Sequence, residues 1–179
     1  GYLSYENIAD KATVAGVEVE VRKNLFVRPL SSAANGMNKL SFGLNGSYIY
    51  TNAKMPLATV TTGSQLEGAA PWIANFDLSH NFTKGNHSFI NTLVFNYVSD
   101  KIYTIGTQGY QDIIEQGMMT LDFVSQAKLN KYVSLTLKAR NLLNPSYKLS
   151  RKANESGEKV VLSDYKKGIN ISLGVSCTF

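Results

Sequence analysis

The chain has 179 residues, of which 44% are hydrophobic, 17% charged and 11% aromatic, and its formal net charge is +5. This length predicts a single domain with enough apolar material for a sizeable buried surface. The sequence contains no run of about eighteen apolar residues that could form a transmembrane helix, and its one cysteine, Cys177, excludes an internal disulfide and a cysteine-based metal cluster.

Alternation of apolar and polar residues with a period of two recurs along the whole chain, whereas helical periodicity is almost absent. The segment "GINISLGVSCTF" at the end is typical, because every second residue is apolar and the residues between them are small or polar. The pattern predicts an all-β fold, an antiparallel meander of about seven long strands. The predicted strands are residues 12–26, 38–52, 69–82, 87–103, 114–129, 133–149 and 160–179.

The length and the charge of these strands favour a membrane location. Most of them exceed the usual globular strand of about five or six residues and suit a tilted membrane crossing of about nine to eleven residues with extensions. The polar faces carry full charges such as Glu18, Glu20 and Arg22, which a dry sandwich core could not hold. An apolar outer surface around a water-filled lumen fits both faces, so the sequence predicts the wall of a transmembrane β-barrel.

The predicted connections have the asymmetry of outer-membrane barrels, with short turns on one side and longer loops on the other. The short turns are 83–86 and 130–132, and the longer, polar links are about 53–68, 104–113 and 150–159. A four-residue turn at 83–86 predicts that Trp72 lies opposite Tyr97.

A three-residue turn at 130–132 predicts the register of the next hairpin. It places Phe123 opposite Ala139 outside and Asp122 opposite Arg140 in the lumen. A cross-strand pair of opposite charges contributes a few tenths to about 1 kcal/mol. The sequence therefore predicts a lumen charge pair between Asp122 and Arg140.

In this arrangement the aromatic residues lie in two groups, one near each end of the strands. Those at the long-loop ends are Tyr48, Tyr50, Trp72 and Tyr97, and those at the short-turn ends are Phe82, Phe89 and Phe179. Two girdles of this kind are expected at the two membrane–water boundaries. The segment "FINTLVFNYV" does not fit well, because it is apolar on both faces and places Asn91 on the lipid side.

Several motifs resemble the barrel of TonB-dependent receptors. "YENIADKATVAGVEVEVRKNL" is similar to a barrel segment that often reads YEN-x-G-K-A-x-x-x-G-V-E-x-E-x-R, and "LTLKARNLLNPSY" resembles the penultimate-strand pattern N-L-F-[ND]-x-x-Y. "YKKGINISLGVSCTF" resembles the last strand, with Ile169 where Arg is frequent and Cys177 where an aromatic is usual. "EGAAPWIANFDLSH" resembles receptors of Bacteroidetes-type bacteria.

The resemblance implies a protein of the bacterial outer membrane that imports a scarce nutrient, such as a siderophore, cobalamin, a glycan or a peptide, with energy from TonB. Such receptors have about twenty-two strands around an N-terminal plug. Residues 1–179 are therefore expected to be the C-terminal portion of the barrel domain, without the plug. The implied partners are outer-membrane lipid and lipopolysaccharide, the rest of the barrel and the plug, TonB, the barrel-assembly machinery and a surface lipoprotein; nucleic acid is not expected.

The resemblance also implies a barrel-assembly signal, which is a terminal aromatic residue on an alternating strand. Its residues in this sequence are Tyr165, Ile171, Leu173, Val175 and Phe179. Contacts with an imported ligand are placed in the loop sequence "YTIGTQGYQ", because loops at a barrel mouth carry recognition. The candidate residues there are Tyr103, Gln108, Tyr110 and Gln111, which offer ring stacking and amide hydrogen bonds.

The sequence predicts no enzyme, with no catalytic, metal or cofactor site. His80 and His87 flank one turn without a cysteine or paired carboxylates beside them, and parity places Asp77 and His80 on opposite faces. No phosphate-binding loop or dinucleotide motif is present. Two alternatives remain open: a small eight-stranded outer-membrane barrel with a structural or adhesive role, and a compact barrel that acts on lipid, which the missing triad disfavours.

Overall fold

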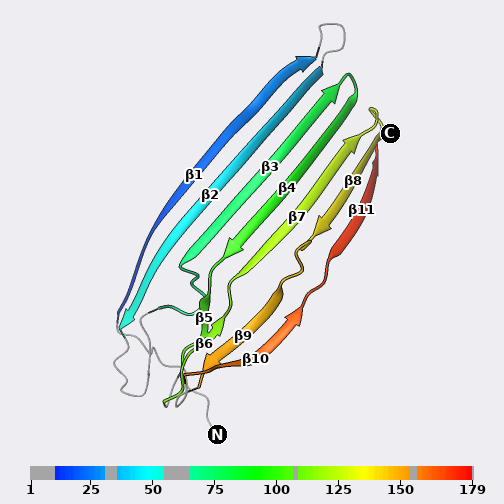
Figure 1. Cartoon of the computed structure of the whole chain (residues 1–179). Helices are drawn as coiled ribbons and strands as arrows, with labels where there is room; N and C mark the ends of the chain where they lie inside the picture. The colour runs from blue at the N-terminus through cyan, green and yellow to red at the C-terminus, as the bar shows by residue number, and fades with distance from the viewer. Residues whose placement is uncertain (1–10, 31–35, 55–64, 107–108, 154–156, 179) are drawn as a thin grey trace.

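The computed structural model describes residues 11–30, 36–54, 65–106, 109–153 and 157–178. These residues form eleven β-strands and no helix, joined into two antiparallel sheets (Figure 1). None of their segments is a helix long and apolar enough to cross a membrane.

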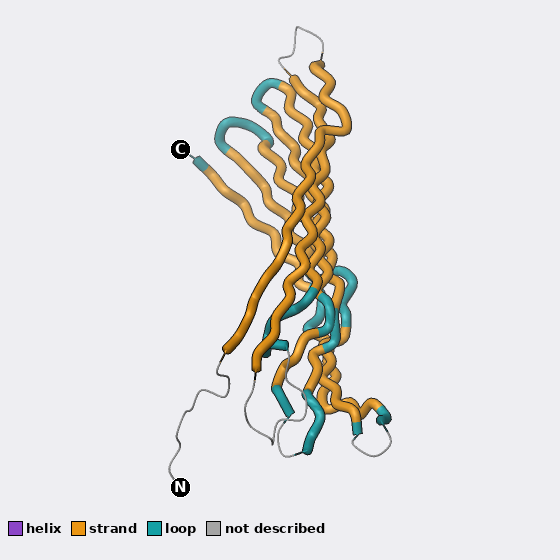
Figure 2. The backbone as a smooth tube through the Cα atoms, turned by 90° about the vertical axis from the view of Figure 1, so that its left-hand side faces the viewer, coloured by secondary structure: helices purple, strands orange, loops and turns teal. Residues whose placement is uncertain are grey.

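The larger sheet contains seven strands in the order β1-β2-β3-β4-β7-β8-β11. Their bounds are β1 Lys11–Leu30, β2 Gly36–Lys54, β3 Trp72–Lys84, β4 His87–Val98, β7 Met118–Lys128, β8 Val133–Arg140 and β11 Asn170–Cys177. Figure 2 shows that these strands form one thin, twisted layer. The prediction of an antiparallel, all-β fold with about seven long strands is confirmed.

The smaller sheet contains four strands in the order β10-β9-β6-β5 and lies at one end of the larger sheet (Figure 1). Its strands are β5 Lys101–Thr104, β6 Ile113–Glu115, β9 Ser146–Lys152 and β10 Lys159–Lys166. Each of them leads along the chain into or out of a strand of the larger sheet. The small sheet therefore extends β4, β7, β8 and β11 beyond a row of breaks.

These breaks correct the predicted strands 87–103, 114–129, 133–149 and 160–179, each of which is divided in two. The third and fourth breaks are held together by side chains: the Asn141 amide donates to the Gly168 carbonyl oxygen at 2.7 Å, and the Gly168 N–H donates to Asn144 Oδ1 at 3.0 Å. Asn141, Asn144 and Gly168 have φ values of 59°, 45° and 82°. Left-handed backbone of this kind cannot continue a strand.

The hairpin between β3 and β4 is tighter than predicted. Its turn consists of Gly85 and Asn86, with Gly85 at φ 57°, so Ala74 rather than Trp72 lies opposite Tyr97. Two-residue hairpin turns require a positive φ, which glycine adopts without strain. The error is two residues, so every side chain keeps its predicted face. The register of the next hairpin is confirmed, because Phe123 pairs with Ala139.

Strand β1 is longer than its prediction of 12–26 and contains a β-bulge. Its register against β2 shifts between Asn24 and Phe26, so that Leu25 is an extra residue. Such an insertion moves all following side chains to the opposite face. As a result Phe26 and Arg28 lie on the same face as Val21. Their partners on β2 are Leu40 and Asn38.

The described residues contain almost no hydrophobic core. Only three of their apolar side chains are buried, Ala53, Ala70 and Ile102. The chain exposes 12334 Å², whereas a compact monomer of 19.7 kDa is expected to expose about 8,600 Å². A single layer of this size must be stabilised by surroundings other than its own interior.

Candidate functional site

One face of the seven-stranded sheet is apolar, and we call it the apolar face. Antiparallel partners lie on the same face, so the register places Val17 with Tyr48, Leu44 with Phe76, and Leu135 with Val175. These side chains are not covered: Ile171 and Leu173 on β11 are 69% and 70% exposed. Exposed apolar surface over seven strands needs an apolar environment, which hydrocarbon tails supply.

The height of the apolar face matches a bilayer. Trp72 and Phe82 mark its two ends on β3 and are ten residues apart. That separation corresponds to about 33 Å along the strand, or about 25 Å across a membrane at a tilt of about 40°. Rings pair at both ends, with centroids 4.5 Å apart for Tyr48 and Trp72 and 6.5 Å apart for Phe82 and Phe89.

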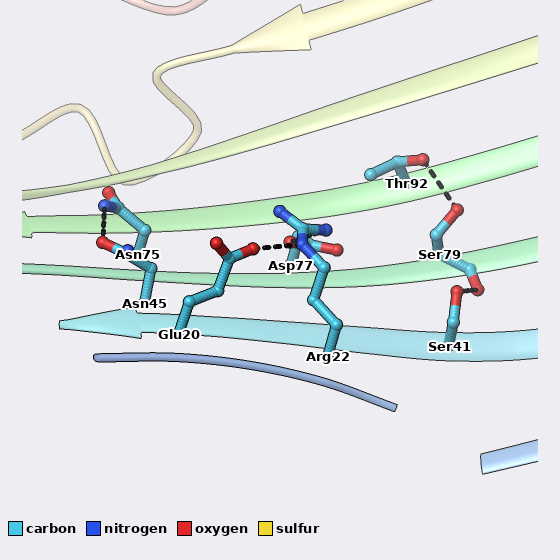
Figure 3. Close-up of polar contacts among 8 residues, drawn as sticks. All are labelled: Glu20, Arg22, Ser41, Asn45, Asn75, Asp77, Ser79 and Thr92. Atoms are coloured by element: carbon cyan, nitrogen blue, oxygen red, sulfur yellow. Dashed lines mark hydrogen bonds and ion pairs between the residues drawn. The ribbon is translucent and has the colours of Figure 1, made fainter. Parts of the chain in front are cut away.

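The opposite face, which we call the polar face, carries every carboxylate of the described seven strands: Glu18, Glu20, Asp77 and Asp122. Figure 3 shows how its side chains connect neighbouring strands. Asn45 on β2 donates to Glu18 Oε1 at 2.5 Å and accepts from the Asn75 amide at 3.3 Å, so it joins β1 to β3.

An ion network on this face spans three strands. Arg22 on β1 contacts Glu20 and lies 3.5 Å from the Asp77 carboxylate on β3, across the intervening strand β2 (Figure 3). The residue of β2 in the same row is Gly43, and a Cβ atom there would overlap the Asp77 carboxylate and lie 3.1 Å from the Arg22 guanidinium. A glycine therefore leaves the space through which the two charges meet.

A hydroxyl row continues the polar face toward the short turns. The Ser41 hydroxyl donates to the Ser79 carbonyl oxygen at 3.5 Å, and the Ser79 and Thr92 hydroxyls are 3.2 Å apart (Figure 3). Fixed, solvated dipoles and charges of this kind suit the wall of a water-filled channel. Sequence parity alone located these residues on the polar face but did not pair Arg22 with Asp77. The glycine opposite Arg22 is the sequence feature that could have indicated the pairing.

The predicted lumen charge pair has a different partner in the structure. Asp122 and Arg140 lie one position further from the hairpin turn than the pair Phe123–Ala139. No ion pair between them occurs in the described part of the chain. The Asp122 carboxylate instead accepts the Asn141 backbone N–H at 2.8 Å. The left-handed conformation of Asn141 turns this N–H toward β7, and the carboxylate thereby caps the end of β8.

The predicted ligand contacts lie at the small sheet. Tyr103 is in β5, and Tyr110 and Gln111 lie in the connection from β5 to β6, while Gln108 lies outside the described residues. The Arg151 guanidinium on β9 lies 5.0 Å from the centre of the Tyr110 ring. Arg151 is therefore a neighbour of Tyr110 that the spacing of the sequence did not indicate.

A network around Glu115 holds the small sheet together. Its carboxylate accepts the Tyr147 hydroxyl at 3.2 Å and pairs with the Lys101 ammonium at 3.2 Å. The Tyr147 ring is 5.0 Å from the ring of Tyr165, between ring centres. Burial and then the charge of Glu115 raise the pKa of the Tyr147 phenol above its ordinary value, which keeps the hydroxyl a hydrogen-bond donor.

The predicted assembly signal is divided between the two sheets. Ile171, Leu173 and Val175 lie on the apolar face of β11, opposite Ala139, Leu137 and Leu135 of β8. Tyr165 belongs to β10 of the small sheet, before the break at Gly168. Phe179 lies outside the described residues.

No group of three or more His, Cys, Asp or Glu side chains that could hold a metal ion occurs among the described residues. Of the two histidines, His80 bonds through Nε2 to Asn38 Oδ1 at 2.8 Å and His87 begins β4. His80 pairs with Asn91, and His87 pairs with Lys84, so the two histidines are not cross-strand partners.

Similarity to known proteins identifies the sheet. The family model of the TonB-dependent receptor-like β-barrel matches residues 1–142, while no curated protein and no solved structure matches the chain at a significant level. The family is an outer-membrane family of receptors and transporters, not of enzymes, and its barrels act in general with a plug and with TonB. The chain therefore belongs to the TonB-dependent receptor family and is part of an outer-membrane β-barrel.

Proposed function

We propose that this chain forms the C-terminal wall of an outer-membrane receptor that imports a scarce nutrient with energy from TonB. The observation that carries the proposal is a single-layer sheet of bilayer height, apolar on one face and charged on the other, in a member of this family. The candidate substrate classes are siderophores, cobalamin, glycans and peptides. The resemblance of "EGAAPWIANFDLSH" supports a Bacteroidetes-type source.

The proposal gives the chain partners at both sheet edges, on both faces and at the loops. Strands β1 and β11 each have a neighbour on one side only within the described sheet, and an unpaired strand edge is costly in lipid. We therefore infer that both edges pair with further strands of the barrel and that the polar face surrounds the plug. The apolar face meets lipid and lipopolysaccharide, Ile171, Leu173 and Val175 are read by the assembly machinery, and a surface lipoprotein covers the loops.

Transport is tested with the complete gene that contains this chain, expressed in its own host. Uptake of labelled siderophore, cobalamin, glycan and peptide is measured with and without TonB, and with and without a protonophore. Uptake of one class that requires both TonB and the proton gradient is the expected result. Passage that continues without either would contradict active import and would favour a passive or structural barrel.

Ligand recognition is tested on two tyrosines with similar surroundings. Tyr110 and Tyr132 are 55% and 53% exposed, and each has a cation near its ring, Arg151 at 5.0 Å and Lys131 at 4.7 Å. Tyr110 stands at the small sheet, whereas Tyr132 stands in the short turn before β8. We expect Tyr110→Ala to weaken substrate binding threefold to about tenfold, the range of one lost ring contact, and Tyr132→Ala to leave it unchanged. Equal effects would contradict a ligand site at Tyr110.

A further inference from the structure

The apolar face is interrupted by a polar strip at its short-turn end. The strip consists of Arg28 on β1, Asn38 on β2, His80 and Lys84 on β3, and His87 and Asn91 on β4. The register places all six on the apolar face. Arg28 pairs with Asn38, Lys84 with His87, and His80 with Asn91, while Phe82 and Phe89 stand among them.

Two hydrogen bonds to asparagines of the strip, one from His80 within it and one from Ser125 on β7, leave amide donors available. His80 Nε2 donates to Asn38 Oδ1 at 2.8 Å, and the Ser125 hydroxyl donates to Asn91 Oδ1 at 2.7 Å. Within the described residues, the nitrogen of neither amide side chain has a partner. An unpaired amide in hydrocarbon costs several kcal/mol, so these donors require an acceptor from outside the sheet.

The charge of the strip is of one sign. Arg28 and Lys84 are both exposed cations, and Lys23, opposite Phe42, is a third exposed cation on the same face, slightly further from the turn. All carboxylates of the described seven strands lie on the polar face. The ring of Phe26 lies 5.6 Å from the Arg28 guanidinium, which holds the side chain on the apolar face beside Asn38. An anionic group with several oxygen acceptors is complementary to this arrangement, as phosphate is to arginine and lysine.

The depth of the strip selects the source of that anion. Phe82 marks the short-turn end of the apolar face, and His80 lies two residues before it on β3. His80 is therefore about 5 Å closer to the middle of the membrane than Phe82. Lys84 and His87 lie on the other side of Phe82 and Phe89, next to the turn. A ligand that touches both levels has a charged group at the boundary and polar oxygens slightly deeper, as the phosphodiester and the ester groups of a glycerophospholipid do.

We propose that the polar strip binds an anionic phospholipid of the inner leaflet. Short turns face the periplasm in outer-membrane barrels, and the strip is adjacent to the short turn Gly85–Asn86. The phosphodiester lies against Arg28 and Lys84, and the ester oxygens accept hydrogen bonds from Asn38 and Asn91. The lipid tails run along Leu78, Leu93 and Phe76 toward the middle of the apolar face.

The test uses the complete receptor that contains this chain, purified in detergent. Native mass spectrometry measures the binding of dioleoyl-phosphatidylglycerol and dioleoyl-phosphatidylcholine to the unchanged protein and to the double variant Arg28→Gln/Lys84→Gln. We expect the unchanged protein to prefer phosphatidylglycerol and the double variant to bind it about 25-fold more weakly, since each cation near an anionic lipid surface contributes about fivefold in affinity. Asn91→Leu, which removes one amide donor, is expected to weaken binding of both lipids about threefold.

The matched control is Lys39→Gln/Lys128→Gln, which removes two cations at the same end of the sheet but from the polar face. It should bind phosphatidylglycerol as the unchanged protein does. Heat-modifiable migration in gels verifies that each variant is a folded barrel. Equal loss in both double variants, equal binding of the two lipids, or loss of lipopolysaccharide rather than phosphatidylglycerol from the strip variant would each overturn the proposal.

Discussion

The four strands of the small sheet continue β4, β7, β8 and β11 of the seven-stranded sheet in the same order. The two sheets differ in the interactions that stabilise them. The large sheet has strands of eight to twenty residues with two chemically distinct faces. The small sheet has strands of three to eight residues, two bulges and a network of ion pairs and tyrosine rings around Glu115. The large sheet lies between lipid and water, and apolar and polar residues alternate along its strands. The small sheet has no face against lipid, and specific side-chain pairs around Glu115 stabilise it.

The largest difference between the two sheets is expected for proline. Phe95 lies in β4, which has hydrogen-bonded neighbours on both sides, whereas Lys159 is the first residue of β10, an edge strand of the small sheet. Phe95→Pro should lower the free energy of unfolding by at least about 3 kcal/mol, and Lys159→Pro should change it little. Urea titration of the folded, heat-modifiable barrel measures both. Similar losses would mean that the two sheets are equally constrained.

The row of breaks between the sheets is tested at two glycines near the end of the chain. Gly168 has φ 82°, whereas Gly174 in β11 has extended backbone and room for a Cβ, with its nearest contact at 3.9 Å. Gly168→Ala should cost about 1–2 kcal/mol, because alanine is strained in left-handed backbone. Gly174→Ala should be neutral or stabilise by up to about 1 kcal/mol. The same urea titration checks this ranking, and a reversed order would contradict the role given to Gly168.

A smaller effect distinguishes the two faces of the large sheet. Gly43 and Gly46 both lie in β2, but a Cβ at Gly43 would overlap Asp77 and a Cβ at Gly46 would meet nothing within 4 Å. Gly43→Ala should separate Arg22 from Asp77 and lower the stability only slightly, since Arg22 is well exposed and water screens its charge. Gly46→Ala should cost nothing. Denaturation at low and high salt measures the difference, which should shrink at high salt; a salt-independent loss would show that packing, not charge, is responsible.

The smallest prediction concerns pH and the small sheet. The pKa of Tyr147 is raised in the folded protein, so its contribution to stability is fully present below the ordinary phenol value of about 10 and is lost as the pH rises through the higher folded value. Tyrosine absorbance at 295 nm during an alkaline titration follows the deprotonation. Tyr147→Phe should remove a component that titrates above the ordinary phenol value.

Much of the large sheet could be predicted because two different solvents constrain every second residue of each strand. The faces of Val17, Phe76 and Leu135 follow directly from parity, and a register error of two residues at Gly85–Asn86 left them unchanged. The breaks at Asn141 and Gly168 were missed because asparagine and glycine also occur inside strands. Their left-handed backbone is stabilised by hydrogen bonds between the segment after β8 and the segment before β11, which only the fold brings together.

The polar contacts were less predictable than the strands. Asp122 was assigned an ionic partner by register, but backbone curvature at Asn141 offers its carboxylate a nearer N–H donor. Arg22 and Asp77 are separated by a whole strand, and only the missing side chain of Gly43 lets them meet. Contacts across one intervening strand depend on the size of the residue between them, which an alternation pattern does not represent.

The extra residue at Leu25 sets the phase of the last part of β1. Without it, Arg28 would point into the channel and the neighbouring Val27 would face outward. One insertion thus decides which side of the membrane wall receives a positive charge, without any substitution elsewhere. An insertion or deletion of one residue within such a strand therefore moves the following lipid-facing side chains of that strand into the lumen, and its lumen-facing side chains into the lipid.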